Sequence, residues 1–308
     1  MKTIEKPWIK LKEYIDHEDY ELINKLQERC IHEDQTALKL ELDYKLGVTL
    51  SNDNISSTHN INEFMYFDGQ QIIGYIGIAN YGAGIEVNGM VHPEYRRQGV
   101  FKRLFELVIA ECKRMNSDCI LLLSDRKSYS GQKFIEAVGA QYKESEYEMF
   151  FKEDNLDRLQ KMISGITFRK ASNADVQEIA RQNVIYFNNE TKDSDNTPID
   201  YEVLILPEEE EKRGMTIYLA EKDHQIIGKV NLQLISNIGG IYGLGVLPEH
   251  RGKGFGRAIL IMAIEKLKGA NARDIMLQVS AENSNALNLY KSCGFMETST
   301  MDYYEQFI

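Results

Sequence analysis

The sequence has few of the residues that build metal sites and disulfide frameworks. Its 308 residues include four cysteines and six histidines. The cysteines form no Cys-x-x-Cys pair, and the histidines form no His-Glu-x-x-His or similar ligand spacing. We therefore expect reduced thiols, a cytoplasmic location and no bound metal.

Long apolar runs and an excess of positive charge are also missing. No apolar run reaches the roughly 20 residues that a membrane-spanning helix needs. The N-terminus is charged throughout and lacks the apolar core of a signal peptide. The net charge of −11 argues against binding to nucleic acid or to an anionic membrane surface. We expect a soluble protein that acts on neither, and the sequence does not indicate its oligomeric state.

A repeat divides the chain into two copies of one unit. Residues 93–99 read Pro-Glu-Tyr-Arg-Arg-Gln-Gly and residues 248–254 read Pro-Glu-His-Arg-Gly-Lys-Gly, at an offset of 155. Upstream, the run Gln-Ile-Ile-Gly at 71–74 returns at 225–228 with an offset of 154. This period is far longer than that of solenoid repeats, so we predict a duplicated domain.

The order of strands and helices predicts the same layered fold in both copies. In the second copy, short apolar strands alternate with amphipathic helices, one of which is capped at Ser172. Such an order indicates an α/β (α+β layered) class, with a mixed, mostly antiparallel central sheet flanked by helices in each copy. We predict a first domain at 1–152, a linker at 153–165 and a second domain at 166–308.

The segment 247–258, Leu-Pro-Glu-His-Arg-Gly-Lys-Gly-Phe-Gly-Arg-Ala, organises the second copy. It joins an apolar, glycine-rich strand to a strongly apolar helix. A strand that turns through glycines into a helix presents backbone N–H groups at the positive end of the helix dipole, which favours an anion. Arg251, Lys253 and Arg257 add positive charge. We predict a pyrophosphate site here.

Two other phosphate-binding motifs do not fit this segment. A P-loop needs a Gly-x-x-x-x-Gly-Lys-Ser/Thr run, which is absent. The dinucleotide fingerprint would need glycine or alanine at Ile259. By contrast, Arg251-x-x-Gly254-x-Gly256, followed by Asn283 and Tyr290, resembles the GCN5-related N-acetyltransferase (GNAT) family in motif and in element order.

The resemblance implies a reaction and a set of residues. Acetyl-CoA would be the co-substrate, with its pyrophosphate on the glycine turn, and a primary amine would attack the thioester directly. The amine must be neutral to attack, although its ordinary pKa is near 10.4, so a base or a desolvating pocket is required. The acceptor is a small-molecule or peptide amine. The cofactor-binding residues expected from the resemblance are Gly245, Val246, Leu247, Arg251, Gly252, Lys253, Gly254, Phe255, Gly256, Arg257 and Asn283.

The resemblance assigns Tyr290 as the acid that protonates the leaving thiolate. Periodicity alone favours a core position for it, because it falls on an apolar helix stripe with Leu289 and Cys293. Asn283 either bonds the coenzyme or organises the turn into the following helix. No general base is visible, and any carboxylate between Glu190 and Glu211 is a candidate.

The glycines of the strand before the turn receive two assignments. We place Gly239 and Gly240 in a hairpin turn. We place Gly243 and Gly245 in the cleft, where close approach of the coenzyme arm beside a bulge requires them.

The first copy departs from this pattern where chemistry is expected. Phe101 stands at the position of Gly256, where it would crowd a phosphate, and Ile135 stands at that of Tyr290. We therefore predict a degenerate first domain and an N-acetyltransferase active site in the second. A non-catalytic acetyl-CoA sensor or interaction module is the alternative.

Overall fold

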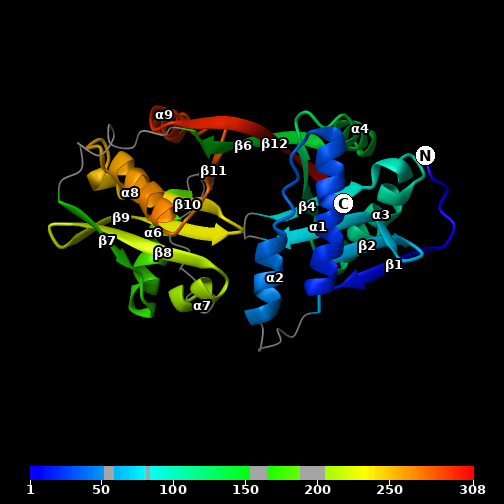
Figure 1. Cartoon of the computed structure of the whole chain (residues 1–308), viewed down its shortest axis with the longest axis horizontal. Helices are drawn as coiled ribbons and strands as arrows, with labels where there is room; N and C mark the ends of the chain where they lie inside the picture. The colour runs from blue at the N-terminus through cyan, green and yellow to red at the C-terminus, as the bar shows by residue number, and fades with distance from the viewer. Residues whose placement is uncertain (52–58, 81–83, 153–164, 188–204) are drawn as a thin grey trace. The chain divides into compact units, whose positions relative to one another are not determined.

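The computed structural model describes the chain outside residues 52–58, 81–83, 153–164 and 188–204 (Figure 1). The described residues form two compact units. Unit 1 holds Met1–Tyr147, Ser280–Glu282 and Ser299–Ile308, and unit 2 holds Glu148–Val279 and Asn283–Thr298. The linker predicted at 153–165 lies almost wholly outside the described residues.

Unit 1 is a mixed sheet between helices. Its strands follow the order β1-β2-β3-β4-β5-β12. The pairs β1–β2, β2–β3, β3–β4 and β5–β12 are antiparallel, whereas β4 and β5 are parallel. The elements that build it are β1 (Pro7–Lys12), α1 (His17–Asp34), α2 (Leu42–Ser51), β2 (Glu63–Asp68), β3 (Gln71–Asn80), β4 (Ile85–Val91), α3 (Val100–Arg114), β5 (Cys119–Asp125), α4 (Tyr129–Val138), the first part of β6 (Gln141–Phe151) and the second part of β12 (Phe295–Phe307).

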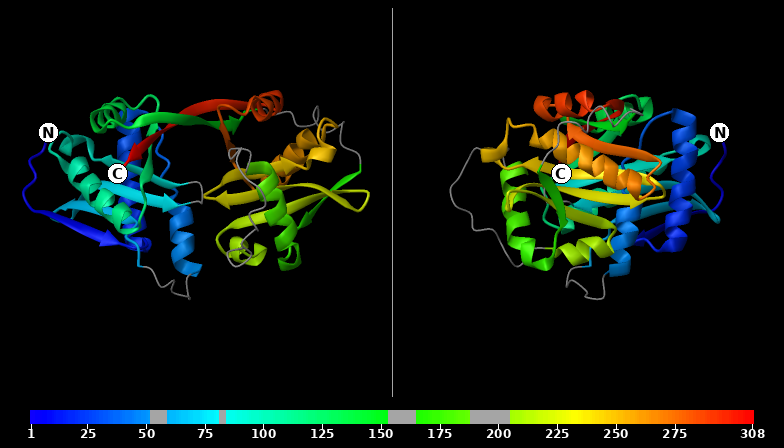
Figure 2. Two further views of the ribbon diagram at one scale, coloured as in Figure 1. Left: turned by 180° about the vertical axis from the view of Figure 1, so that it is seen from behind. Right: turned by 60° about the vertical axis from the view of Figure 1, so that its left-hand side comes forward.

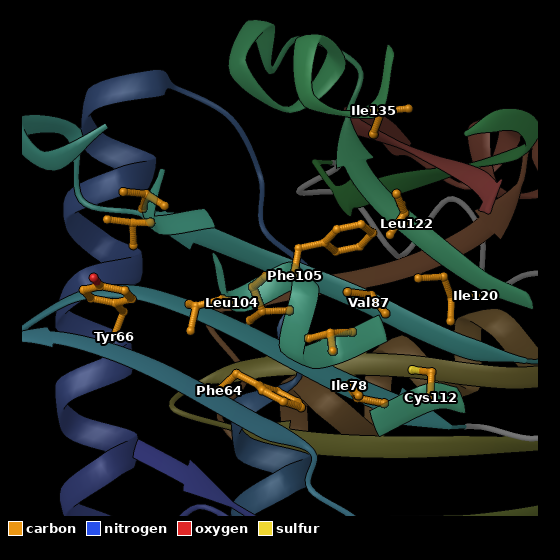
Figure 3. Close-up of a cluster of buried hydrophobic side chains, with 14 of the residues drawn as sticks. Phe64, Tyr66, Ile78, Val87, Leu104, Phe105, Cys112, Ile120, Leu122 and Ile135 are labelled. Carbon is orange, nitrogen blue, oxygen red and sulfur yellow. The ribbon is translucent and has the colours of Figure 1, made fainter. Parts of the chain in front are cut away.

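The two faces of this sheet pack against different helices. Ile76 and Ile78 of β3 join the apolar cluster around α3, which Figure 3 shows with Leu104 and Phe105. Tyr75 of the same strand joins the cluster under α1 and α2. Because the side chains of a strand alternate between two faces, α3 covers one face and α1 with α2 covers the other. The front and rear views show this arrangement (Figures 1 and 2).

Unit 2 repeats the layers with its own elements. Its strand order includes β11-β10-β9-β8-β7, α8 packs on β9 and β10, and α6 contacts the same two strands. The capping box expected at Ser172 is present, with Asp175 as its partner. The elements are β7 (Ile166–Lys170), α6 (Val176–Phe187), α7 (Pro207–Lys212), β8 (Met215–Lys222), β9 (Gln225–Ile235), β10 (Ile238–Val246), α8 (Phe255–Gly269), β11 (Asp274–Ser280) and α9 (Ser284–Ser292). The expected α/β fold is confirmed in both copies.

One extra residue in β10 explains the change of repeat offset. When residues are matched through their partners on the preceding strand, Tyr242 corresponds to Asn88, at an offset of 154. Gly245 corresponds to Met90, at an offset of 155. The register of β10 shifts between Tyr242 and Gly245, whereas β4 keeps a regular register along its whole pairing with β3. The second copy therefore carries a β-bulge that the first copy lacks.

The turn of the β9–β10 hairpin lies earlier than predicted. Ser236 and Asn237 form it, with φ angles of 48° and 70°. Two left-handed residues in succession give the turn the twist that joins antiparallel strands. The assignment of Gly239 and Gly240 to this turn is wrong, because both lie inside β10. A Cβ on Gly240 would lie 2.3 Å from the ring of Tyr242, so glycine there makes room for the ring.

The end of the chain belongs to unit 1. Residues 301–307 of β12 pair antiparallel with β5, and Tyr303 among them is only 3% exposed. Its hydroxyl donates to the Glu146 carboxylate at 2.5 Å and accepts from Lys39 Nζ at 2.6 Å. Conversely, residues 148–151 of β6 belong to unit 2. The two units are thus interleaved along the sequence, unlike the contiguous domains expected from the repeat.

This interleaving makes a residue near the C-terminus a stability determinant of unit 1. Replacing the buried Tyr303 in Tyr303→Ala should lower the free energy of unfolding by about 3–5 kcal/mol, as for other buried aromatic residues. Hydrogen exchange should accelerate in peptides from residues 1–147. Phe307→Ala on the same strand, where the ring is 65% exposed, is the control and should change stability by about 0.5 kcal/mol or less. Equal effects of the two variants would contradict the assignment.

Candidate active site in unit 2

The centre of unit 2 is an opening between two parallel strands. The parallel ladder of β10 and β11 runs from Ile238–Asp274 to Ile241–Leu277, although β10 continues to Val246. Beyond Ile241, β10 keeps its pairing with β9, with the bulge described above. Beyond Ile241, the edge of β10 that faces away from β9 therefore has no ladder with β11 in this described part of the sheet.

The glycine turn follows this opening. Gly252 and Gly254 have φ angles of 74° and 83°, and a Cβ on either would meet no atom within 4 Å. Gly254 is the N-cap of α8, and no side chain of the described residues caps the helix there. The first N–H groups of this 15-residue helix can therefore bond an anion. At Gly256, by contrast, an added Cβ would lie 3.4 Å from the Leu289 side chain, which is an ordinary van der Waals distance. The described residues therefore do not require glycine at this position.

The three basic side chains of the turn have different partners. Arg251 Nε donates to the Val246 carbonyl at 2.9 Å, and Lys253 Nζ donates to the Glu249 carbonyl at 2.9 Å. These bonds hold both side chains along the turn. Arg257 instead donates to the hydroxyl and the carbonyl of Ser292, at 2.7 and 3.2 Å. Its guanidinium links α8 to the C-terminal end of α9, and its predicted contact with a coenzyme stays a prediction.

Tyr290 lies in α9 and is 8% exposed. Its ring centroid is 6.1 Å from that of Phe295, and its hydroxyl makes no hydrogen bond to any of the described residues. Burial raises the pKa of Tyr290 to about 12, which keeps the hydroxyl protonated at neutral pH. Asn283 organises the turn into α9, because its side chain caps this helix by accepting from Ala286 N at 3.1 Å. Its predicted contact with a coenzyme stays a prediction.

Three further residues, from α6, α7 and β9, lie around Gly245 or interact electrostatically with a residue beside it. Two of them were not named from the sequence, and the third, Glu210, lies within the range of candidate bases. The ring of Tyr186 covers Gly245 so closely that a Cβ there would lie 2.2 Å from it. Glu210 of α7 is half-buried, and burial raises the pKa of its carboxyl. Lys229 of β9 is 1% exposed. A signal for Lys229 is visible in the sequence, where a lysine interrupts the apolar strand.

Lys229 lies beside the bulge. Its Nζ donates to Asn231 Oδ1 at 3.3 Å and to the Gly243 carbonyl at 3.4 Å. Gly243 has a φ of 53°, and a Cβ there would come within 3.0 Å of the ammonium. Glycine is thus required at this position by the backbone and by the lysine together. Burial lowers the pKa of Lys229 to about 8, and the electrostatic field of Glu210 opposes this effect only partly.

Unit 1 keeps the turn but changes its surroundings. Arg97 and Gly99 have φ angles of 63° and 81°, close to those of the second turn. Arg96 Nε bonds the Val91 carbonyl at 3.0 Å, as Arg251 does in unit 2. The guanidinium of Arg96 also forms a bidentate ion pair with Asp34, at 2.7 Å for each bond. The positive charge of Arg96 is therefore largely compensated by Asp34.

Unit 1 nevertheless contains a cavity of about 760 Å³ next to this turn. Phe101, expected to crowd a phosphate, packs its ring edge-on against Phe134 at 4.6 Å and lines the cavity. Ile135 at the position of Tyr290 is 5% exposed and belongs to the apolar core, where Figure 3 shows it. The cavity of unit 1 thus has an isoleucine at the position of Tyr290, although Tyr95 and Tyr129 also line it.

Metal ligands and membrane spans can be searched only within the described residues. There, no group of three or more His, Cys, Asp or Glu side chains is placed to hold a metal ion. In the same part of the chain, no helix combines the length and apolar character needed to cross a membrane.

Two layered units, each with a splayed parallel strand pair and a glycine turn before a helix, define a tandem α/β protein. The model of the acetyltransferase (GNAT) family matches residues 21–139 and 181–295. These two regions include the glycine turns and cover most of the chain. The protein belongs to the GNAT family.

Known acetyltransferases differ in their sequence identity to this chain and in how much of it they cover. A mycothiol acetyltransferase of Streptomyces coelicolor is 33% identical over 87 residues, which are 27% of this chain and 28% of that protein. The corresponding protein of Stackebrandtia nassauensis is 24% identical over 253 residues, covering 76% of this chain and 79% of that protein. A GCN5-related N-acetyltransferase from Sphaerobacter thermophilus shares the fold, with a TM-score of 0.71, 17% identity and coverage of 97% and 95%.

The buried Lys229 gives a testable dependence of stability on pH. Its pKa in the folded protein is about 8, below the ordinary value of 10.5, so the unfolded state binds more protons between these two values. Stability should therefore rise with pH across this window. Lys229→Met should remove this rise and, at pH 7, stabilise the protein by up to about 3 kcal/mol.

Chemical unfolding of both proteins at pH 7 and pH 9 measures this difference. The advantage of the variant should shrink by about 1.4 kcal/mol per pH unit once the pH exceeds 8. Lys212→Met, at an exposed position of α7, is the control for a lost surface charge. A Lys229→Met protein that is less stable than the wild type at pH 7 would contradict the burial of an uncompensated charge.

Proposed function

We propose that the protein transfers an acetyl group from acetyl-CoA to a primary amine, and that unit 2 performs the reaction. The observation that carries this proposal is the combination, in one unit, of the open strand edge, the uncapped glycine turn and a buried tyrosine. Unit 1 has the turn and a cavity but has Ile135 where unit 2 has Tyr290.

The turn and the strand edge would hold the co-substrate. The N–H groups at the start of α8, with Arg251 and Lys253 alongside, would bind the pyrophosphate. The edge of β10 beyond Ile241 would bond the pantetheine arm, and an N–H at Gly245 or Val246 would stabilise the oxyanion that develops on the thioester carbonyl. The N–H of Leu247 is excluded, because it donates to the Ile227 carbonyl at 3.0 Å. Tyr186, over Gly245, would close the α6 side of this position.

Tyr290 would complete the transfer. The neutral amine attacks the carbonyl carbon and the N–C bond forms, while the nitrogen gives one proton to the general base. The C–S bond then breaks, and the sulfur takes a proton. The Tyr290 hydroxyl can donate this proton because burial keeps it protonated. Burial of the reacting sulfur raises the basicity of the thiolate as well, which reduces the mismatch with the ordinary thiol pKa of about 8.5.

Glu210 is the candidate for the general base. It lies within the range of carboxylates expected to supply one, and its raised pKa makes it a better proton acceptor than an exposed glutamate. The amines to be tested include acceptors of the mycothiol type, which the name of the relatives suggests.

Matched glycine variants decide which unit works. Gly254 and Gly99 occupy the same position with almost the same φ, so valine at either position introduces the same backbone strain. Gly254→Val should lower acetyl-CoA-dependent acetylation of an amine panel more than 100-fold, whereas Gly99→Val should leave it within a few-fold of the wild type. Mass spectrometry of the products and release of free thiol measure both. The reverse pattern would place the reaction in unit 1.

The tyrosine acid has its own test. Tyr290→Phe should lower kcat by about 10²–10⁴-fold, the range typical of a lost general acid, with little change in acetyl-CoA affinity. Tyr129→Phe is the control, because Tyr129 lies at the start of α4 in unit 1 and is 77% exposed. An unchanged kcat in Tyr290→Phe would remove the acid role. Acetyl-CoA binding without turnover on any amine would instead favour a sensor or interaction module.

A further inference from the structure

Unit 2 contains a buried cation, Lys229, and what we infer for it rests on the proposed function. Lys229 is only 1% exposed, and the two acceptors of its ammonium, Asn231 Oδ1 and the Gly243 carbonyl, are uncharged. Among the described residues, no carboxylate lies within ion-pair distance of it. A buried ammonium without an anion is costly, which marks this position as a candidate functional site.

The side of the sheet that Lys229 faces follows from its strand partner. Lys229 pairs with Gly245, and paired residues point to the same face of a sheet. The Gly245 position is covered by Tyr186 of α6, and a Cβ at Gly243 would meet the lysine ammonium on the same side. Gly228, the neighbour of Lys229, faces Ile259 of α8 instead. The ammonium therefore lies on the α6 side of the strand edge, opposite the helix that begins at the glycine turn.

A second polar atom, close to Glu210 in sequence, is buried without a hydrogen bond. Arg213, directly after α7, has a buried Nε with no hydrogen-bond acceptor. Its guanidinium lies 3.8 Å from Glu210, beyond hydrogen-bond distance. Glu210 is within electrostatic range of both Arg213 and Lys229. Glu209 acts on Glu210 as well, so these groups show no surplus of charge. The feature that remains is the Lys229 ammonium, which is buried and has only neutral acceptors.

We propose that Lys229 binds a carboxylate of the acceptor, so that the acceptor is an amine that also carries a carboxylate group. A single negative charge matches the one positive charge of the buried Lys229 ammonium better than the two negative charges of a phosphate ester. Binding would replace the two long bonds of the ammonium by a charge-assisted bond of ordinary length. Gly243, which leaves room for the ammonium beside the bulge, is part of the same arrangement.

The test compares acceptors that differ only in this group. An amino acid, its carboxamide and the corresponding aminoalkyl phosphate are acetylated by the full chain under identical conditions, and kcat/KM is determined for each. The wild type should prefer the carboxylate over the carboxamide by at least about 30-fold, equivalent to about 2 kcal/mol. Lys229→Met should abolish this preference, and Lys229→Arg should retain part of it.

Two measurements keep the outcome decisive. Calorimetry with acetyl-CoA should give the same affinity in Lys229→Met as in the wild type, which separates acceptor recognition from co-substrate binding. Lys212→Met should keep the full preference for the carboxylate. Equal rates for the carboxylate and the carboxamide in the wild type would overturn the inference and leave the acetyltransferase proposal intact. A preference for the phosphate would likewise overturn the choice of carboxylate.

Failure of the proposed function gives a different result. If no amine is acetylated, amino acids and their carboxamides are compared as ligands by thermal shift of the wild type and Lys229→Met proteins. Stabilisation by the carboxylate in the wild type alone would support the anion site without the reaction. No selective stabilisation would overturn it.

Discussion

The hydrogen-bonding requirement of the β10 backbone is the constraint on which the proposed site depends. A buried strand must pair its N–H and C=O groups on both edges, but the ladder with β11 ends at Ile241. The bulge before Gly245 and the glycine turn after Val246 both lie on the segment that this ending leaves open. Tyr186 and Lys229 then close the α6 side of the segment. The bulge, the glycine turn, Tyr186 and Lys229 therefore all lie along the same segment of β10, which is unpaired with β11.

The two units share one backbone scaffold but differ in the side chains around the glycine turn. Both keep the turn, its left-handed residues and the arginine bound to the last carbonyl of the preceding strand. Unit 2 adds the bulge and a cation beside it. Unit 1 has Tyr75 at the position of Lys229, with its hydroxyl bonded to Glu63 at 2.5 Å. The polar group at this position is thus paired with a carboxylate in unit 1 and with neutral groups in unit 2.

Much of the fold could be predicted from the sequence, because it depends on local signals. The capping box at Ser172, the glycine turns and the one-residue change of repeat offset are all local features. The hairpin turn was misplaced because Gly239 and Gly240 are needed for packing against Tyr242 and α8 rather than for a turn. Lys229 could not be assigned, since its burial depends on helices distant in sequence. The pairing of β12 with β5 likewise could not be predicted, because the two strands are far apart in the sequence.

That pairing has a consequence for biosynthesis. The sheet of unit 1 is completed by residues 301–307, which are the last part of this sequence to leave the ribosome. The first 147 residues therefore wait for the final strand, and β5 presents an open edge during that interval. A gene cut between the two copies would deprive each half of residues that its unit uses. Separate expression of the first copy would therefore leave unit 1 without β12.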